Sequence, residues 1–144
     1  MDNGQIARAF FAEVWSRGKL DFIDQNFDRS FQSHETLEPN GNLELLKNKV
    51  QMYRSAFPDV VVAADELTEA GDKVLVRWTA RGTHRGNLFG KPGTGKRFEV
   101  QGLSVLIFRN GKIIEEWTQW DAFGMLRQLG IVAELAQPGA QPSA

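Results

Sequence analysis

The order of helical and strand patterns in this chain of 144 residues predicts a single α+β domain. Apolar residues recur at helical spacing over residues 5–57, whereas alternation with period two dominates residues 60–120. Two hairpin signals, Glu69-Ala70-Gly71-Asp72 and Asn110-Gly111, indicate that neighbouring strands run antiparallel. Helices followed by a run of antiparallel strands are typical of the α+β class.

The first helix is expected over residues 4–17. Asp2 or Asn3 can cap its start, and Gly18 suits the position just past its end. Its apolar residues spread beyond a single stripe, which is typical of a helix that is largely covered by other elements.

A short second helix is expected over residues 20–27, and a brief extended segment over residues 30–35. Asn42 is placed to cap a third helix, whose apolar residues recur at spacings of three and four as far as Phe57. Pro58 then ends the helix, because the residue before a proline disfavours helical geometry.

Four strands are expected in the second half of the chain. They cover residues 60–67, 74–81, 98–109 and 113–120, with a Gly/Pro-rich loop at 82–97 and a final helix at 122–129 that ends at Gly130. The third of these strands carries Leu103, Val105 and Ile107 on one face, and Leu106 and Phe108 on the other. One face is therefore expected to contact helices, and the other to form a pocket or a subunit interface.

The composition of the chain indicates where the domain ends and excludes several classes of protein. The domain is expected to span residues 1–136, and the Pro/Gly/Ala/Ser-rich residues 137–144 to form a disordered tail. A net charge of −1 gives no general field that would attract nucleic acid or an anionic membrane. No cysteine is present, which excludes disulfides and thiolate chemistry. No apolar run approaches the roughly 20 residues of a membrane helix, and no signal peptide is visible, so a cytoplasmic protein is expected.

Residues 90–96 match the glycine and lysine spacing of a phosphate-binding loop. That motif requires Ser or Thr next, to bind magnesium, and a helix whose N-terminus holds the phosphate. Arg97 follows here, and residues 98–100 have a strand pattern. The segment is therefore interpreted as a flexible hairpin loop.

His34 and His84 are the chain's two histidines, and neither lies at a spacing that supports a metal site. Each is expected to line a cavity or to be hydrogen-bonded in a loop. His84 follows a strand end, where site residues are common. Ser104 lacks the Gly-x-Ser-x-Gly context of a serine nucleophile.

Asp121 lies between an aromatic strand and an apolar helix, and two interpretations are equally supported. As an N-cap, its carboxylate would accept a backbone N–H and stabilise the helix by about 1 kcal/mol. As a catalyst, it would share a strand face with Trp117 and Gln119 if the strand has no bulge. Indole walls would then raise the pKa of this carboxyl towards neutrality, as acid–base catalysis requires.

Three segments are similar to characteristic segments of the SnoaL-like polyketide cyclases, also called ester cyclases. They are residues 80–96, 108–117 and 120–130, and the similarity extends over nearly the whole chain as far as Val132. The resemblance implies a cone-shaped α+β barrel like that of nuclear transport factor two. In that fold a curved sheet and the N-terminal helices enclose an apolar cavity. It also implies a homodimer or higher homo-oligomer built through the sheet.

The resemblance also implies a mechanism. In anthracycline cyclases of this family, an aspartate matching Asp121 acts as acid/base in an intramolecular aldol ring closure, without cofactor or metal. His84 matches a family histidine after the same strand, and His34 lies near a cavity-lining polar position. Ser104 stands where the cyclases carry a second cavity histidine, which departs from the family's pattern.

The function expected from these observations is cofactor-independent cyclisation of a hydrophobic, carbonyl-rich small molecule. Asp121 would be the acid/base, with His84 and His34 on substrate oxygens. The substrate-binding residues would be Trp117, Gln119, Trp78, Ser104 and Phe108. The alternatives are a non-catalytic binder of an apolar ligand and a hydroxylase of the same fold. A hydrolase with an Asp-Arg-Asp relay is less supported, since Arg77 and Arg81 have no aspartate two residues away on their strand.

Overall fold

The computed structural model of the protein describes residues 1–35 and 40–132, so the expected tail at residues 137–144 lies outside the described residues. The elements follow in the order α1 (Asn3–Ala9), η1 (a π-helix, Phe10–Trp15), α2 (Asp21–Asn26), β1 (Phe27–Glu35), α3 (Leu43–Ala56), β2 (Val61–Ala70), β3 (Lys73–Thr83), β4 (Arg97–Arg109), β5 (Lys112–Trp120) and α4 (Ala122–Gln128).

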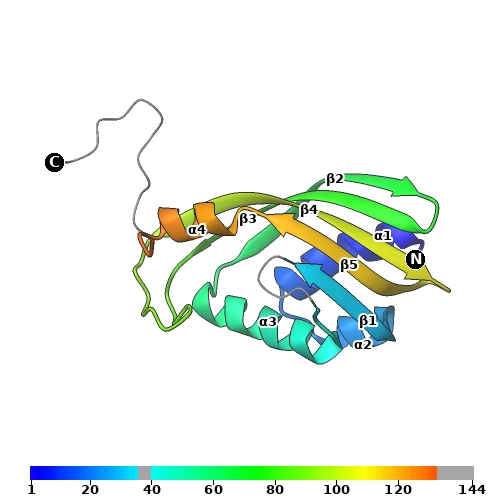
Figure 1. The fold of residues 1–144 in the computed structure, drawn as a ribbon, viewed down its shortest axis with the longest axis horizontal. Coiled ribbons are helices and arrows are strands. Elements are labelled where there is room, and N and C mark those ends of the chain that lie inside the picture. The colour runs from blue at the N-terminus through cyan, green and yellow to red at the C-terminus, as the bar shows by residue number, and fades with distance from the viewer. Residues whose placement is uncertain (36–39, 133–144) are drawn as a thin grey trace.

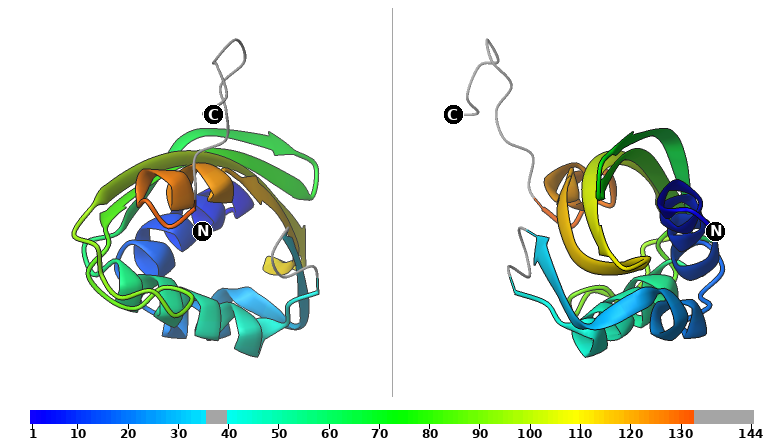
Figure 2. Two further views of the ribbon diagram at one scale, coloured as in Figure 1. Left: turned by 60° about the vertical axis from the view of Figure 1, so that its left-hand side comes forward. Right: turned by 90° about the vertical axis from the view of Figure 1, so that its right-hand side faces the viewer.

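The five strands form one curved sheet in the order β1-β5-β4-β3-β2 (Figure 1). The pairs β2–β3, β3–β4 and β4–β5 are antiparallel, whereas β1 pairs with β5 in parallel. The sheet bends into an arc, and α1, η1 and α3 lie on its concave side (Figure 2). The predicted α+β class, with a curved, antiparallel-rich sheet and N-terminal helices against it, is confirmed.

The first helix starts as predicted and then changes its winding. A capping box at its start joins Asp2 and Gln5 by hydrogen bonds of 2.8 and 2.9 Å, and Gly18 follows with φ +72°. The single α-helix expected over residues 4–17 is instead α1 followed by the π-helix η1. In the i→i+5 bonding of η1, the Ser16 N–H donates to the Phe11 carbonyl at 3.1 Å.

Most other elements agree with the patterns in the sequence. The Asn42 side chain caps α3 by accepting from the Leu45 N–H at 2.9 Å. Both hairpins form, with positive φ at Gly71, Asn110 and Gly111. The short extended segment predicted at residues 30–35 is part of the longer strand β1.

A β-bulge on β5 changes which side chains face the core. Phe108 pairs with Ile113 and Ile107 pairs with Glu115, so Ile114 is an extra residue opposite β4. Ile113 is buried before the bulge, and the alternation then shifts so that Glu116 is buried after it. The bulge therefore places Trp117 and Gln119 on the face opposite to the buried Ile113, whereas an unbulged strand would place all three on one face.

Candidate active site

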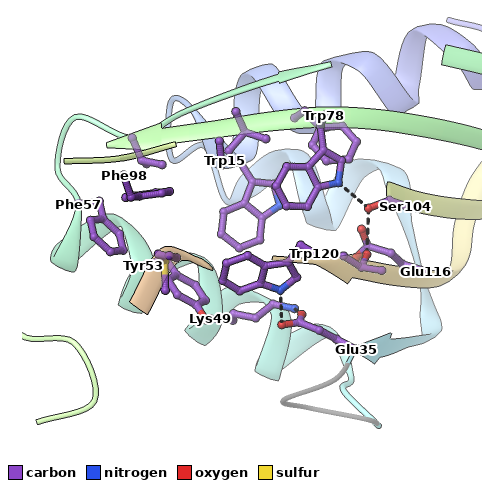
Figure 3. A pocket seen from close by; sticks show the side chains of 16 residues that line it. Trp15, Glu35, Lys49, Tyr53, Phe57, Trp78, Phe98, Ser104, Glu116 and Trp120 are labelled. Carbon is purple, nitrogen blue, oxygen red and sulfur yellow. Dashed lines mark hydrogen bonds and ion pairs between the residues drawn. The ribbon is translucent and has the colours of Figure 1, made fainter. Parts of the chain in front are cut away.

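A pocket lies between the concave side of the sheet and the helices, with a free space of about 640 Å³ that includes its opening to solvent (Figure 3). Its lining is mainly aromatic and aliphatic: Phe11, Trp15, Tyr53, Phe57, Val60, Val62, Trp78, Ala80, Phe98, Trp120 and Met125, together with the polar residues Glu35, Lys49, Ser104, Glu116 and Thr118. The pocket is thus an apolar cavity that contains a small group of polar side chains.

A buried ion pair joins β1 to α3 at this pocket. Lys49 Nζ lies 2.5 Å from Glu35 Oε2, and the two side chains are 6% and 5% exposed. The indole N–H of Trp120 donates to the other oxygen, Glu35 Oε1, at 3.1 Å (Figure 3). Both carboxylate oxygens of Glu35 are therefore hydrogen-bonded.

Glu116 supplies a second buried carboxyl, from β5, and is 5% exposed. Burial raises the pKa of this carboxyl above its ordinary value of 4.5, because the charged form loses its hydration. The Lys49 ammonium opposes this rise in pKa, as do hydrogen bonds from the hydroxyls of Thr118 and Ser104, whereas the Glu35 charge adds to it. The acid form of Glu116 therefore persists at a pH where an exposed glutamate is ionised.

A hydrogen-bonded chain connects this carboxyl to the aromatic wall. Trp78 Nε1 donates to Ser104 Oγ at 3.0 Å (Figure 3). Ser104 Oγ in turn lies 2.9 Å from Thr118 Oγ1. The indole N–H can only donate, so the Ser104 oxygen accepts this hydrogen bond. The O–H of Ser104 is then available to donate to Thr118 or Glu116.

The predicted substrate-binding residues divide into three groups. Trp78 and Ser104 line the pocket, as expected. Phe108 is buried in the core but does not line the pocket. Trp117 is 52% exposed, and neither it nor Gln119 lines the pocket, because the bulge turns both away from it. Trp120, which the unbulged pattern directs outward, lies in the pocket instead.

Asp121 forms the N-cap of α4. Its Oδ1 accepts from the Gly124 N–H at 2.8 Å, which confirms the capping interpretation. The residue is exposed and does not itself line the pocket, although Trp120 and Met125 on either side of it do. Its catalytic role stays a prediction.

The two histidines lie outside the pocket lining. His34 stacks on Trp117, with ring centroids 4.0 Å apart, and its Nε2 lies 3.3 Å from Glu115 Oε2. His84 is fully buried and its Nδ1 lies 3.1 Å from Thr94 Oγ1, whereas its Nε2 has no hydrogen-bond partner among the described residues. The structure therefore does not bring either histidine together with the polar groups of the pocket.

The sequence patterns missed Lys49 and Glu116, the buried ammonium and carboxyl groups that line the pocket. Lys49 lies three residues after Leu46 and four before Tyr53, both of which belong to the apolar stripe of α3. A charged residue inside an apolar stripe is a signal for a buried charge, and it could have been noticed. Glu116 gave a weaker signal, because choosing between it and Glu115 requires knowing where the bulge lies.

Comparisons with known proteins identify the family. The family model described as SnoaL-like polyketide cyclase matches residues 5–129. The chain belongs to the SnoaL-like polyketide cyclase family. This confirms the resemblance that the sequence motifs indicate.

Individual relatives of this cyclase family agree with that assignment. The chain is 30% identical over 122 residues to aklanonic acid methyl ester cyclase DnrD of Streptomyces peucetius, covering 82% of this chain and 84% of that one. The crystal structure of IdmH, described as a putative polyketide cyclase from Streptomyces antibioticus, matches with a TM-score of 0.77 at 28% identity, covering 88% and 96% of the two chains. TsrD from Streptomyces laurentii shares the fold, with a TM-score of 0.80 at 23% identity over 92% and 99%.

Across residues 1–35 and 40–132, no helix is long and apolar enough to cross a membrane. Over the same residues, no group of three or more histidine or acidic side chains is arranged to hold a metal ion.

Proposed function

We propose that this chain is a cofactor-independent polyketide cyclase. It would close a ring in a hydrophobic, carbonyl-rich small molecule by an aldol-type reaction under acid–base catalysis. The observation that carries the proposal is the apolar pocket with the carboxyl of Glu116 buried in its wall. Family membership supports the same class of reaction.

The chemistry of the pocket fits such a substrate. Aromatic walls from Trp15, Trp78 and Trp120 offer large apolar surfaces to a flat ring system. A carboxyl of raised pKa provides a proton donor inside that apolar environment. An aldol ring closure uses such a proton donor, since it moves protons but consumes no oxidant or reductant.

The relatives suggest a substrate with which to test this. DnrD is named for aklanonic acid methyl ester, and that compound serves as the probe here. Purified protein is incubated with the ester without added cofactor, and the product is followed by chromatography with mass detection. The proposal expects a new compound of unchanged mass, because cyclisation is an isomerisation. Binding of the ester without a new compound at any pH would favour a non-catalytic binding protein.

Asp121 remains our proposed base for this reaction. Asp121→Asn preserves the cap, because Asn is an equally good N-cap residue, and it removes the base. Turnover is expected to fall by about 100-fold, at the low end of what a positioned acid or base contributes. If Asp121→Asn turns over the ester as fast as the unsubstituted protein, Asp121 is not the base.

A hydrolase relay has little support from the pocket. No arginine of the described residues lines it, and Arg77 pairs instead with Asp65 and Glu66. A hydroxylase remains an alternative, and the same incubation separates it from a cyclase, since hydroxylation adds the mass of an oxygen atom.

A homodimer built through the sheet stays part of the proposal. Leu75, Leu103 and Trp117 are exposed, and all three lie on strands of the sheet. Light scattering after size exclusion measures the oligomeric state directly, and a monomer at micromolar concentration would contradict this part.

A further inference from the structure

We infer that Lys49 and Glu116 form an oxyanion site for a carbonyl oxygen of the ligand, with Lys49 held in place by its ion pair with Glu35. The acid form of Glu116 donates a proton to that oxygen, and the Lys49 ammonium stabilises the negative charge that develops there. The inference rests on the proposed function for its substrate class, and it assigns roles to residues that neither the family model nor the relatives' names specify.

The placement of the three groups is the first support. They come from three separate elements, β1, α3 and β5, and converge on the wall of one apolar pocket (Figure 3). Removing such groups from water is unfavourable, and apolar residues of similar volume often stabilise a core as well or better. A buried acid beside a buried ion pair in the wall of an apolar pocket therefore favours a role in binding or chemistry.

Lys49 has donors available for a ligand. An ammonium carries three N–H bonds. Within residues 1–35 and 40–132, its hydrogen-bond acceptor is a single oxygen of Glu35. A ligand oxygen in the pocket can therefore accept from Lys49 without breaking the ion pair.

Glu116 is supported in both of its protonation states. The hydroxyls of Ser104 and Thr118, which bond to each other at 2.9 Å, are near enough to its carboxyl to lower its pKa by hydrogen bonding. A hydroxyl can donate to a carboxylate and can accept from a carboxylic acid, so the same two partners serve either form. After Glu116 gives up its proton, the carboxylate is held by these hydroxyls and by the nearby Lys49 charge.

The charged groups around Glu116 set the pH dependence of the site. Lys49 from α3 lowers the pKa of its carboxyl and Glu35 from β1 raises it, while burial contributes the largest upward shift. Ser104 from β4 is not titratable, and Tyr53 from α3 is the remaining titratable side chain of the pocket wall. Because the acid form of Glu116 is the donor, the rate of enolisation should fall as pH rises through this raised pKa.

The proton transfers of this step balance. A base, for which Asp121 is our candidate, removes a proton from the carbon next to the carbonyl, and the C–H electron pair moves to the carbonyl oxygen. That oxygen takes the proton of Glu116 and becomes an enol. In ring closure the enol returns its proton to Glu116 while its carbon bonds to a second carbonyl carbon. The alkoxide formed there takes the proton held by the base, so nothing is oxidised or reduced.

Enolisation can be tested apart from ring closure. The probe is α-tetralone, an apolar ketone that enolises but has no second carbonyl with which to cyclise. Exchange of its C2 protons for deuterium is followed by NMR in D2O, and its binding by the fluorescence of the pocket tryptophans. For Glu116→Gln, kcat is expected to fall by about 100-fold with little change in KM, and the loss of rate at high pH should disappear.

The matched control is Glu115→Gln on the same strand, whose side chain lies beyond the bulge on the other face and should leave exchange unchanged. Unfolding midpoints are measured for both variants, so that a fall in kcat with an intact midpoint separates chemistry from folding. Exchange by Glu116→Gln within threefold of the unsubstituted protein, or no exchange above buffer by the unsubstituted protein, overturns the inference. Glu116-dependent exchange without cyclisation of the polyketide ester would support the oxyanion site while contradicting the proposed cyclase.

Discussion

The buried pair of Lys49 and Glu35 gives the sharpest stability prediction, through the substitution Lys49→Met. Methionine fills the space of the lysine stem but leaves the Glu35 carboxylate without its cation. Both side chains are almost fully buried, so the surface value of about 0–1 kcal/mol for an ion pair does not apply. Removing one partner of a buried pair costs about 3–5 kcal/mol, because the remaining charge stays out of water. The Trp120 N–H still donates to Glu35, so we expect a loss near 3 kcal/mol.

The assay is unfolding in urea, followed by tryptophan fluorescence. If the free energy of unfolding falls by about 2 kcal/mol for each molar of urea, a loss of about 3 kcal/mol lowers the urea midpoint by about 1.5 M. The double variant Lys49→Met with Glu35→Gln removes the stranded charge while keeping an acceptor for Trp120. It should therefore be more stable than Lys49→Met alone. A single-variant loss below about 1 kcal/mol, or a double variant less stable than the single, would refute the reasoning that this pair is desolvated.

Three further predictions concern the acid and the pocket wall. Burial raises the folded-state pKa of Glu116 above 4.5. The unsubstituted protein should therefore lose stability relative to Glu116→Gln as pH rises from about 4.5 through that raised pKa. The measurement is the urea midpoint of both proteins as a function of pH. The fall in the rate of α-tetralone exchange at high pH should move to lower pH in Glu35→Gln, which removes a neighbouring negative charge. It should move to higher pH in Lys49→Met, which removes a positive charge. Shifts of the opposite sign would contradict the assigned charges. A Cβ at Gly102 would collide with the Trp78 ring, which lines the pocket. Gly102→Ala should therefore destabilise the protein by about 1–3 kcal/mol and raise the KM for α-tetralone. An unchanged urea midpoint would show that the ring moves freely.

Local patterns predicted the elements of this fold well, because each depends on neighbouring residues. The caps at Asp2 and Asn42 and the turn at Asn110-Gly111 are determined by side chains a few residues apart. The parallel pairing of β1 with β5 could not be predicted in this way. It joins segments about 80 residues apart, and neither segment contains a signal for the other.

The candidate site was predicted less well than the fold. Of the predicted substrate-binding residues, Trp78 and Ser104 line the pocket, on strands whose alternation is regular at these positions, and their binding role stays a prediction. The ion pair of Glu35 and Lys49 depends on how α3 docks against β1, and this tertiary packing is not encoded in a short window. The sequence therefore predicted an apolar pocket and one of its polar residues, Ser104, but not Glu35, Lys49 or Glu116.

The bulge at Ile114 explains why the predicted site residues Trp117 and Gln119 lie outside the pocket while Glu116 and Trp120 line it. Two glutamates are adjacent on β5, and strict alternation from the buried Ile113 would place Glu115 inside and Glu116 outside. A one-residue change of register reverses every side chain beyond it. With Ile114 as the extra residue, Glu116 and Trp120 enter the pocket. Nothing in the residue type of Ile114 marks a bulge, because isoleucine favours regular strands. The position of the bulge, rather than the composition of the strand, thus determines which carboxyl is buried and which chemistry the pocket can perform.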